Sequence, residues 1–439
     1  MALTDIHYDK AVLDLLRPIH PSRLFKRWMA FLLISLIVCG VAYYFQIRDG
    51  LVVTGMRDYI SWGMYIANFV FFVATSLVGM LLSAVLGLTG IKWATPLTRI
   101  AEIIALAFAM VAGLVIIVDM GHPERLLNVF MYGRLQSPIV WDVTVVSIYV
   151  ALSALLLYLP LIPDLKICAD RLERAPGFQR KLYKILSLGW HGSPEQAKII
   201  NKSVRILSIL IIPVALAIHT VTSWLFASTT RPGWDSTILG PYFVTGAFVA
   251  GSAAVIIAMY FFRQNYKLRD YITDLHFDKM GKLLVLVSLV YLYFNINEFL
   301  VPAYKMKTAE AIHLHTLFEG HFALLFWSTQ IFGLVLPLLF LLFKKMRKAK
   351  PLMIISIFVF IGAWLKRYLI VIPTLEHPFL PIQNVPEHFK VYTPTINESL
   401  ITFGTLILAL IIITILSKFL PIIPIWETTQ NHTHQEENE

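Results

Sequence analysis

The sequence predicts an all-α membrane protein that crosses the bilayer about ten times. Three observations predict this class: the chain is 57% hydrophobic, its mean hydropathy is +0.70, and only 15% of its 439 residues are charged. Soluble domains carry about 25% charged residues. Long apolar runs recur from the first thirty residues nearly to the end. This composition excludes a soluble enzyme, a disordered protein and a disulfide scaffold.

The apolar runs define the predicted crossings, because an α-helix needs roughly 20 apolar residues to cross about 30 Å of hydrocarbon. They are residues 28–48, 60–88, 97–119, 138–161, 204–228, 241–263, 280–302, 320–343, 351–373 and 396–420. An N-terminal segment, 1–27, precedes them, and a polar tail, 421–439, follows. The charged segment 162–203 separates the fourth crossing from the fifth. Its basic residues alternate with Leu182, Ile185 and Leu186, a pattern that favours an interfacial amphipathic helix.

The basic residues predict the orientation. Of the 37 Lys and Arg, 27 lie in the loops and ends on the N-terminal side, 8 lie in the opposite loops, and Lys366 and Arg367 lie within a helix. Cytoplasmic loops of membrane proteins are enriched in Lys and Arg. Both termini are therefore expected in the cytoplasm, and the net charge of +10 needs no nucleic-acid partner. Membrane lipids are the expected surroundings.

Six polar side chains fall in or beside the outer half of the second to fifth crossings, at about 1.5 Å of rise per residue. They are Tyr65, Asn68, Asp119, His122, Asp142 and His219. Consecutive helices usually pack together, so one outer pocket lined by all six is expected. Each alone has an ordinary explanation: a helix-end carboxylate facing water, an interhelical hydrogen bond, or a buried core histidine.

A second polar group falls in the outer half of the later crossings. It comprises Asn295, Asn297, Glu298, Glu319, His321, Lys366, Arg367 and Glu398. Opposite charges inside a membrane favour paired ions, and the alternative is a proton or ion path. Near the inner end of the third crossing, Glu102 either pairs with Arg99 or forms a cytoplasmic proton entrance.

The sequence predicts no redox centre of its own. Cys39 and Cys168 have no partner at metal-ligand spacing, which argues against an iron–sulfur cluster or another metal. No helix carries the paired histidines that a haem needs, and no Walker or Rossmann glycine pattern is present. Electrons would therefore need a diffusible carrier. A quinone fits, because carboxylates and histidine can accept the protons that a quinol releases. The same groups also suit a transported ion.

At the third and fourth crossings the sequence becomes specific. The segment VDMGHPERLLNVFMYGRLQSPIVWDV (118–143) resembles the NrfD/polysulfide reductase membrane-subunit family, which shows Asp-Leu-Gly-x-Pro-x-Arg followed by Ser-Pro-x-x-Trp-Asp/Gly. Other segments are similar to the quinol-oxidising membrane subunits of alternative complex III within that family. They are SLGWHGS (187–193), HTVTSWLFA (219–227), RPGWDSTILGPYFVTGA (231–247), LKRYLIVIP (365–373) and VYTPTINE (391–398).

The resemblance implies an architecture and a set of partners. It implies two four-helix bundles, 60–161 with 204–228, and 241–373, flanked by 28–48 and 396–420. It implies a menaquinone or ubiquinone site near the periplasmic face of the first bundle, in a bacterial inner membrane. The electrons would pass to or from an extracytoplasmic iron–sulfur subunit, joined by cytochrome c or molybdopterin subunits. Proton translocation is a further implication, with Glu102, Glu298 and Arg367 as the path.

The expected quinone site has two groups of residues. Asp119, His122 and Asp142 would handle protons, and Tyr65, Asn68, Trp141 and His219 would shape the pocket. Arg125 would either pair with a carboxylate to hold the motif loop or contact the iron–sulfur partner. Two other functions fit the same sequence. One is a proton- or ion-coupled secondary transporter, and the other is a membrane anchor that docks a redox partner without binding quinone.

Overall fold

The computed structural model describes residues 12–19, 22–172, 176–229, 231–379 and 383–428, and this part of the chain is helical and contains no strand. Ten of its helices or helix assemblies are long and apolar enough to cross a membrane, which confirms the predicted fold class. They are α2 (Arg23–Asp49), α3 (Met64–Thr89), α4 (Thr95–Asp119), α6 (Pro138–Arg171), α8 (Pro194–Ala227), α9 (Leu239–Asn265), α10 (Asp274–Lys305), the run of α12 (Ala323–Gln330), the π-helix η5 (Ile331–Val335) and α13 (Leu336–Leu341), then α14 (Ala349–Leu375) and α15 (Ile396–Phe419).

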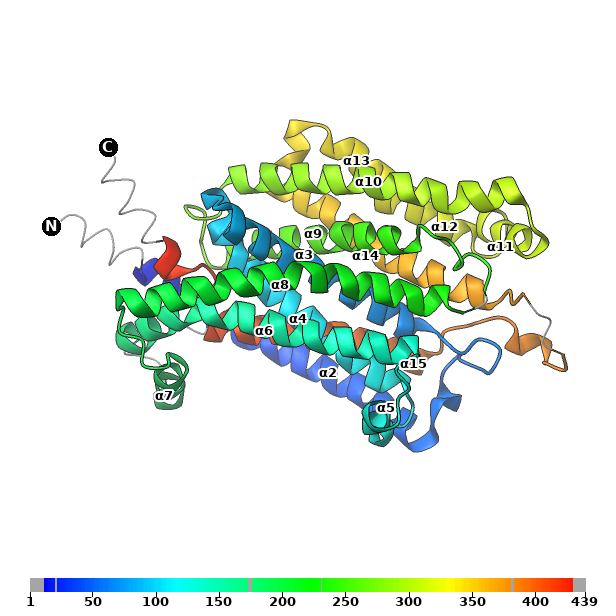
Figure 1. Cartoon of the computed structure of the whole chain (residues 1–439), viewed down its shortest axis with the longest axis horizontal. Coiled ribbons are helices and arrows are strands. Elements are labelled where there is room, and N and C mark those ends of the chain that lie inside the picture. The colour runs from blue at the N-terminus through cyan, green and yellow to red at the C-terminus, as the bar shows by residue number, and fades with distance from the viewer. Residues whose placement is uncertain (1–11, 20–21, 173–175, 230, 380–382, 429–439) are drawn as a thin grey trace.

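The crossings run side by side along the long axis of the molecule (Figure 1). At one end, here called the terminal end, Nζ of Lys418 donates to the carbonyl of Pro18 (2.5 Å), so the described beginning and end of the chain meet there. The opposite end, where α4 ends at Asp119, is called the distal end.

The crossings pack in two groups and a pair. The first group is α3, α4, α6 and α8, and the second is α9, α10, α12–α13 and α14; α3 lies against α9 and α14 where the groups meet, and α2 pairs with α15 beside α4. Small residues allow the close approaches that membrane helices need. A Cβ on Gly79 of α3 would lie 2.0 Å from the carbonyl oxygen of Ala101 in α4.

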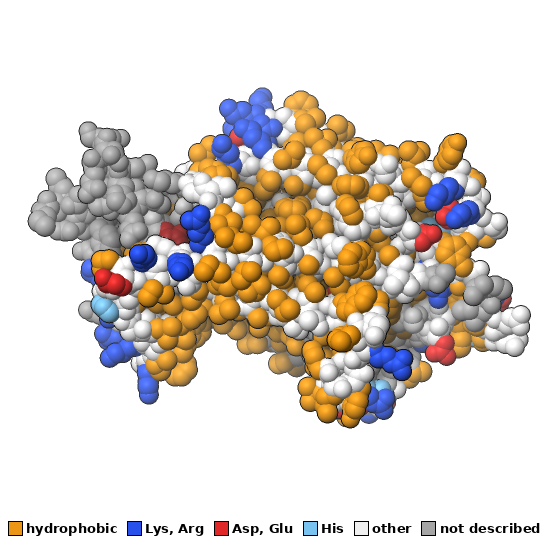
Figure 2. All heavy atoms as spheres, viewed as in Figure 1, with side chains coloured by type: hydrophobic (Ala, Val, Ile, Leu, Met, Phe, Trp, Pro, Cys, Tyr) orange, Lys and Arg blue, Asp and Glu red, His pale blue; other side chains and the backbone are white. Residues whose placement is uncertain are grey.

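The surface has the polarity of a membrane protein. Figure 2 shows hydrophobic side chains covering the middle of one face, with Lys and Arg gathered toward its ends and margins. Exposed apolar residues such as Ile37 of α2, Leu286 of α10 and Phe358 of α14 belong to this apolar surface. Lipid is the surrounding that stabilises so large an exposed apolar area.

Two expected boundaries at the terminal end are wrong. The segment 162–203 is not one loop, because α6 continues to Arg171 and α8 begins at Pro194. The helices extend because Asp164 is fully buried against Arg99 rather than solvated (3.3 Å). The expected extra helix is present as α7 (Gly177–Leu186), which exposes Phe178 and Ile185.

Other boundaries also shift. Residues 60–63 precede α3 rather than opening it, since Gly63 packs against Tyr392 and Glu398. An additional helix, α11 (Thr308–Phe318), leads into the eighth crossing. The start of the expected polar tail is apolar and buried at Ile422, Ile423 and Ile425. The acidic end of that tail, residues 430–439, lies outside the described residues, as do residues 1–11 of the N-terminal segment.

Candidate functional site

The first group of candidate residues lies at the distal end, where α4 ends at Asp119. Gly121 then turns the chain with φ of +68°, a left-handed conformation that favours glycine. The chain forms η4 (Pro123–Arg125) and α5 (Leu126–Met131) before α6 begins. The motif 118–143 is therefore a connection that leaves the helix bundle, turns at the distal end and re-enters the bundle.

Asp119 presents a buried, unpaired carboxylate oxygen at the end of α4. Its Oδ1 is buried and has no hydrogen-bond partner, and the carboxylate interacts electrostatically with Tyr65 and Glu398. The Tyr65 hydroxyl donates to Oε1 of Gln46 (2.6 Å), whose Nε2 donates to the carbonyl of Val118 (2.8 Å). A buried polar atom without a partner costs about 1–3 kcal/mol. This oxygen can therefore accept a hydrogen bond from a ligand that brings a donor.

Glu398 joins the start of α15 to the loop before α3. Its Oε2 accepts the backbone N–H of Gly55 (2.9 Å), and its Oε1 accepts the hydroxyl of Tyr392. That hydroxyl in turn accepts the N–H of Met64 (2.9 Å). A Cβ on Gly63 would lie 2.5 Å from the same hydroxyl. This arrangement holds the first turn of α3, and hence Tyr65, beside the end of α4.

Asp142 and His219 lie elsewhere in the first group. Asp142 is buried, and its Oδ1 accepts the hydroxyl of Thr222 in α8 (2.6 Å). His219, one turn earlier in α8, is also buried, and its Nε2 has no hydrogen-bond partner. The charged group that interacts with His219 is Arg367 of α14. The imidazole therefore lies toward the second group of crossings.

Asn68 makes two interhelical hydrogen bonds. Its Nδ2 donates to Oγ1 of Thr405 in α15 (2.7 Å), and its Oδ1 accepts Nε1–H of Trp364 in α14 (3.2 Å). Both amide atoms are thus engaged, and the buried side chain links three helices. This is the structural role that the sequence left open for Asn68.

Three predicted site residues lie on the surface of the distal connection. His122 is exposed, with Nδ1 2.9 Å from Oε1 of Glu124. Hydrogen bonds from its own backbone N–H and from His122 lower the pKa of Glu124. Arg125 is exposed and takes part in none of the ion pairs of the described residues. Trp141 is partly exposed and donates its Nε1–H to the carbonyl of Leu135.

The single pocket lined by six side chains stays a prediction, because the described part of the structure shows no direct bond among them. Within the described residues, no hydrogen bond or ion pair joins two of those six, although Tyr65 and Asp119 interact electrostatically. The depth of a residue along its helix places all six at one level of the bundle. Depth does not determine how each helix is rotated about its own axis, and this rotation turns Asn68 and His219 toward α14 and leaves Asp119 with Tyr65.

Glu102 belongs to a buried charged cluster near the terminal end. Its carboxylate accepts the Ser83 hydroxyl and lies 3.7 Å from Nε of Arg99, so the predicted pairing is confirmed. Nη2 of Arg99 also lies 3.3 Å from Asp164, which accepts the backbone N–H groups of residues 425 and 426 (3.3 and 2.9 Å). The cluster thus ties α4 and α6 to the end of the described chain.

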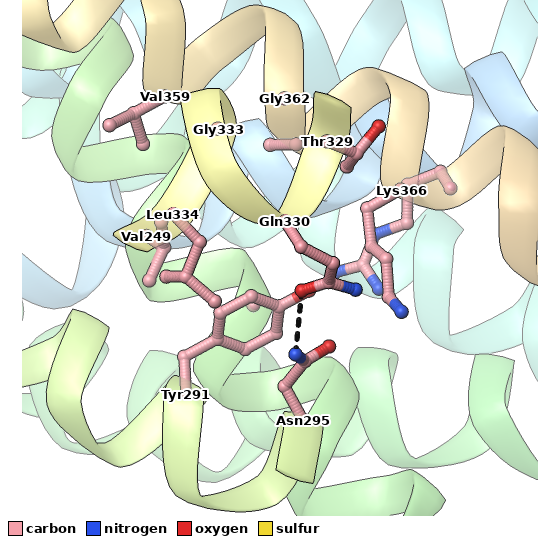
Figure 3. Close-up of a pocket in the computed structure, with 13 residues that line it drawn as sticks. Val249, Tyr291, Asn295, Thr329, Gln330, Gly333, Leu334, Val359, Gly362 and Lys366 are labelled. Atoms are coloured by element: carbon pink, nitrogen blue, oxygen red, sulfur yellow. Dashed lines mark hydrogen bonds between the residues drawn. The ribbon is translucent and has the colours of Figure 1, made fainter. Parts of the chain in front are cut away.

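Three members of the second polar group, Asn295, Lys366 and Arg367, line a small cavity in the second group of crossings (Figure 3). Its volume is about 20 Å³, which is room for one water-sized species. Lys366 and Arg367 line it and are buried, yet neither takes part in an ion pair of the described residues. Glu298 lies beyond ion-pair distance of Lys366, and Lys366 lies 4.4 Å from the ring centre of Phe299.

Histidines and a glutamate gather at the distal end of the second group. Nε2 of His321 lies 3.1 Å from the carboxylate of Glu376, and Thr316 Oγ1 lies 2.8 Å from Nε2 of His377. Burial raises the pKa of Glu376 and lowers that of His377. Burial, followed by the neighbouring His377, lowers the pKa of His313 to about 3. His313 is therefore a neutral imidazole at ordinary pH.

Sequence reasoning misses several residues that shape the distal site and the charged cluster. Gln46 lies inside an apolar crossing, where a lone amide is itself a signal, since polar groups in a membrane are costly. Tyr392 belongs to the segment 391–398, to which the sequence alone assigns no role. The charges around Asp164 favour a loop, so its pairing with Arg99 does not emerge from the sequence.

Comparison with known proteins agrees with this architecture. A family model described as "Polysulphide reductase, NrfD" matches residues 52–377. A dimethyl sulfoxide reductase membrane subunit of Halobacterium salinarum is 28% identical, with 74% of this chain and 71% of that protein covered. A selenate reductase subunit of Mesobacillus selenatarsenatis is 25% identical, with 91% of this chain and 94% of that protein covered.

A third relative extends the range of complexes. The Hdr-like menaquinol oxidoreductase integral membrane subunit of Archaeoglobus fulgidus is 23% identical, with 91% of this chain and 94% of that protein covered. All three relatives are subunits of reductases or oxidoreductases by name. The family resemblance seen in the sequence motifs is thereby confirmed, and the finer likeness to alternative complex III stays a prediction.

Proposed function

Because the chain belongs to the polysulphide reductase NrfD family, we propose that it is the quinone- or quinol-binding membrane subunit of a reductase complex. It would exchange electrons between the quinone pool and an iron–sulfur partner. The observation that carries the proposal is the buried, unpaired Oδ1 of Asp119 at the distal end, where the carboxylate interacts electrostatically with Tyr65. The name of one relative, a menaquinol oxidoreductase subunit, favours menaquinone over ubiquinone.

The unpaired carboxylate oxygen at the distal end suits one hydroxyl of a quinol ring. Asp119 would accept a proton from a quinol hydroxyl, or return one, through its unpaired Oδ1. Tyr65 is held by Gln46 (2.6 Å) and would orient that carboxylate and exclude water from it. When bound, the quinone supplies two-electron, two-proton chemistry. Asp142 and His219 would serve a ligand that reaches between the two groups of crossings.

The exposed distal connection suits a partner surface. His122, Glu124 and Arg125 are exposed directly after the turn that holds Asp119. Leu127, Phe130 and other apolar side chains of α5 are exposed beside them. An iron–sulfur subunit bound here would lie close to Asp119, and Arg125 would contact that subunit. A molybdopterin or cytochrome c subunit would join beyond it.

The distribution of basic residues supports the orientation of this assembly. Lys and Arg are 27 on the terminal side and 8 on the distal side, so the terminal end would face the cytoplasm. The distal site would then open outside the cytoplasmic membrane, in bacteria the inner membrane. Protons released from a quinol at Asp119 would leave on that outer side.

A proton path through the bundles is part of the proposal. Glu102, Glu298 and Arg367 each carry a buried side-chain atom without a hydrogen-bond partner, Oε2 in the glutamates and Nη1 in the arginine, and Glu102 also pairs with Arg99. Ionisable groups inside a membrane mark such paths. Proteoliposomes that contain the complex should acidify their distal compartment beyond the protons that the quinol itself releases.

One experiment separates this function from the two others that fit the sequence. The native complex is purified in mild detergent, and its subunits and extracted lipids are identified by mass spectrometry. A stoichiometric quinone together with an iron–sulfur subunit supports the proposal. An iron–sulfur subunit without quinone favours a structural anchor, and a lone chain without quinone favours a proton- or ion-coupled transporter.

A further inference from the structure

The second group of crossings contains two adjacent buried cations with one carboxylate among them. Lys366 and Arg367 are 5% and 3% exposed. Glu298 is the carboxylate that interacts with Lys366, and it lies beyond ion-pair distance. The net charge of these three side chains is +1 when all are ionised. A buried charge without compensation is costly in a membrane, so the site needs either a further anion or the loss of a proton.

The cavity beside these cations carries donors and no carboxylate. Lys366 separates it from a second cavity of about 20 Å³, which is lined by Glu298 and His313. The polar residues of the first cavity are Tyr291, Asn295, Thr329, Gln330, Lys366 and Arg367, none of them acidic. Lys366 lines both cavities, Arg367 lines the first and Glu298 the second, so the first cavity has two cations and no carboxylate in its lining and is electropositive.

A chain of hydrogen bonds turns one more donor into this cavity. The Tyr242 hydroxyl donates to Oδ1 of Asn295 (2.8 Å), and Nδ2 of Asn295 donates to Oε1 of Gln330 (2.7 Å). The Nε2 group of Gln330 is left buried and without a partner, as is Nη1 of Arg367. Figure 3 shows the Asn295–Gln330 bond, with Lys366 on the other side of Gln330.

The backbone is specialised at the same place. The π-helix η5 starts immediately after Gln330, and π-helical turns inside α-helices frequently mark functional sites. Gly333 of η5 packs on Gly362 of α14 so closely that a Cβ on Gly333 would lie 2.8 Å from Cα of Gly362. This contact brings Gln330 to the helix turn that carries both cations.

We infer that this cavity binds one small monovalent anion of the halide class, held by Lys366, Arg367 and Nε2 of Gln330. The volume of about 20 Å³ admits a single water-sized species and excludes sulfate or a carboxylate ligand. The anion satisfies the two unpaired donor groups and balances the excess positive charge. This site lies apart from Asp119, and it does not depend on quinone binding.

The test is the melting temperature of the purified complex at constant ionic strength, in sodium chloride, sodium bromide or sodium gluconate. Gluconate is too large for the cavity. The melting temperature should rise with the concentration of chloride or bromide along a saturating curve and remain low in gluconate, because a ligand that binds only the folded state stabilises it. Equal melting in all three salts would overturn the inference, since a proton path through Glu298 and Arg367 needs no halide.

Two variants and a control assign the effect to this cavity. Arg367→Gln should melt at the same temperature in chloride and gluconate. Gln330→Glu places a carboxylate where the anion lies, so its melting temperature should be high in both chloride and gluconate. This variant tests the site even if Arg367→Gln does not fold. Arg347→Gln breaks a partly buried pair with Asp278 (2.8 Å) that lies outside the cavity lining, so it should keep the halide response. A halide response retained in both cavity variants would refute the site.

Discussion

Replacing Asp119 by Asn separates catalysis from stability at the distal site. The change keeps the shape of the side chain and removes its charge. In the structure Oδ1 of Asp119 is buried without a donor, a condition that costs about 1–3 kcal/mol. Asp119 takes part in no hydrogen bond or ion pair of the described residues that Asn would break. Asn still has an unpaired acceptor here but removes the buried charge, so the free energy of unfolding should stay the same or rise by up to about 1–3 kcal/mol.

The effect on turnover should be opposite and large. Proton transfer by a positioned side chain contributes typically 10²–10⁴-fold to a rate, and an amide cannot accept the proton. Quinol oxidation, or quinone reduction, by the purified complex should fall at least about 100-fold in Asp119→Asn. The assay follows quinol absorbance with an artificial electron acceptor or donor, and an SDS titration of the same preparation gives stability.

A matched control carries the same chemical change at another carboxylate. Asp278, near the terminal end, pairs with Lys282 (2.6 Å) and Arg347 (2.8 Å). Asp278→Asn should keep full turnover and lose about 1–3 kcal/mol, because it weakens charged hydrogen bonds to two partners in a partly buried site. Normal turnover in Asp119→Asn would refute the proton-handling role, and equal losses of stability and turnover would reduce Asp119 to a structural residue.

Three further outcomes follow from buried contacts. Arg99→Met leaves Glu102 and Asp164 without a cation, so an SDS titration should show that the free energy of unfolding falls by about 3–5 kcal/mol. The double variant Arg99→Met with Glu102→Gln should recover part of this loss, and no recovery would contradict the pairing. Gly79→Ala forces α3 from α4, because its Cβ would meet a carbonyl oxygen at 2.0 Å, and should cost about 1–3 kcal/mol; unchanged stability would contradict that packing. Burial lowers the pKa of His313 to about 3, whereas the pKa of histidine in an unfolded chain is about 6.5. The free energy of unfolding should therefore be constant above pH 6.5 and fall by about 1.4 kcal/mol per pH unit as the pH drops from there toward 3. His313→Gln should lack that acid-dependent loss, and an unchanged pH profile would show that His313 is not buried neutral.

The crossings could be predicted because hydrocarbon thickness imposes one length scale on the sequence. The third and last crossings end within a residue of their predicted ends, at Asp119 and Phe419. Helix ends outside the hydrocarbon follow no such rule. There the ends depend on partners distant in sequence, as when Asp164 pairs with Arg99 and lengthens α6 into a segment whose charges favour a loop.

The sequence predicts which polar residues belong to the candidate site and how deep each lies in the membrane, but not which of them contact one another. The sequence locates Asp119 at the distal end and Lys366 within a helix. Which residues meet depends on helix rotation and on the packing of the later crossings against the earlier ones. Glu398 shows this, because it belongs to the last crossing in sequence yet interacts with Tyr65 and Asp119 of the first group.

The most direct measurement of the central claim is photo-crosslinking of an azidoquinone to the intact complex in its native membrane, with the labelled peptides mapped by mass spectrometry. Label should appear at the distal ends of α3 and α4, on peptides that contain Tyr65 or Asp119, and an excess of unlabelled quinone should displace it. Label confined to the second group of crossings, or to other subunits, would contradict a quinone site at Asp119.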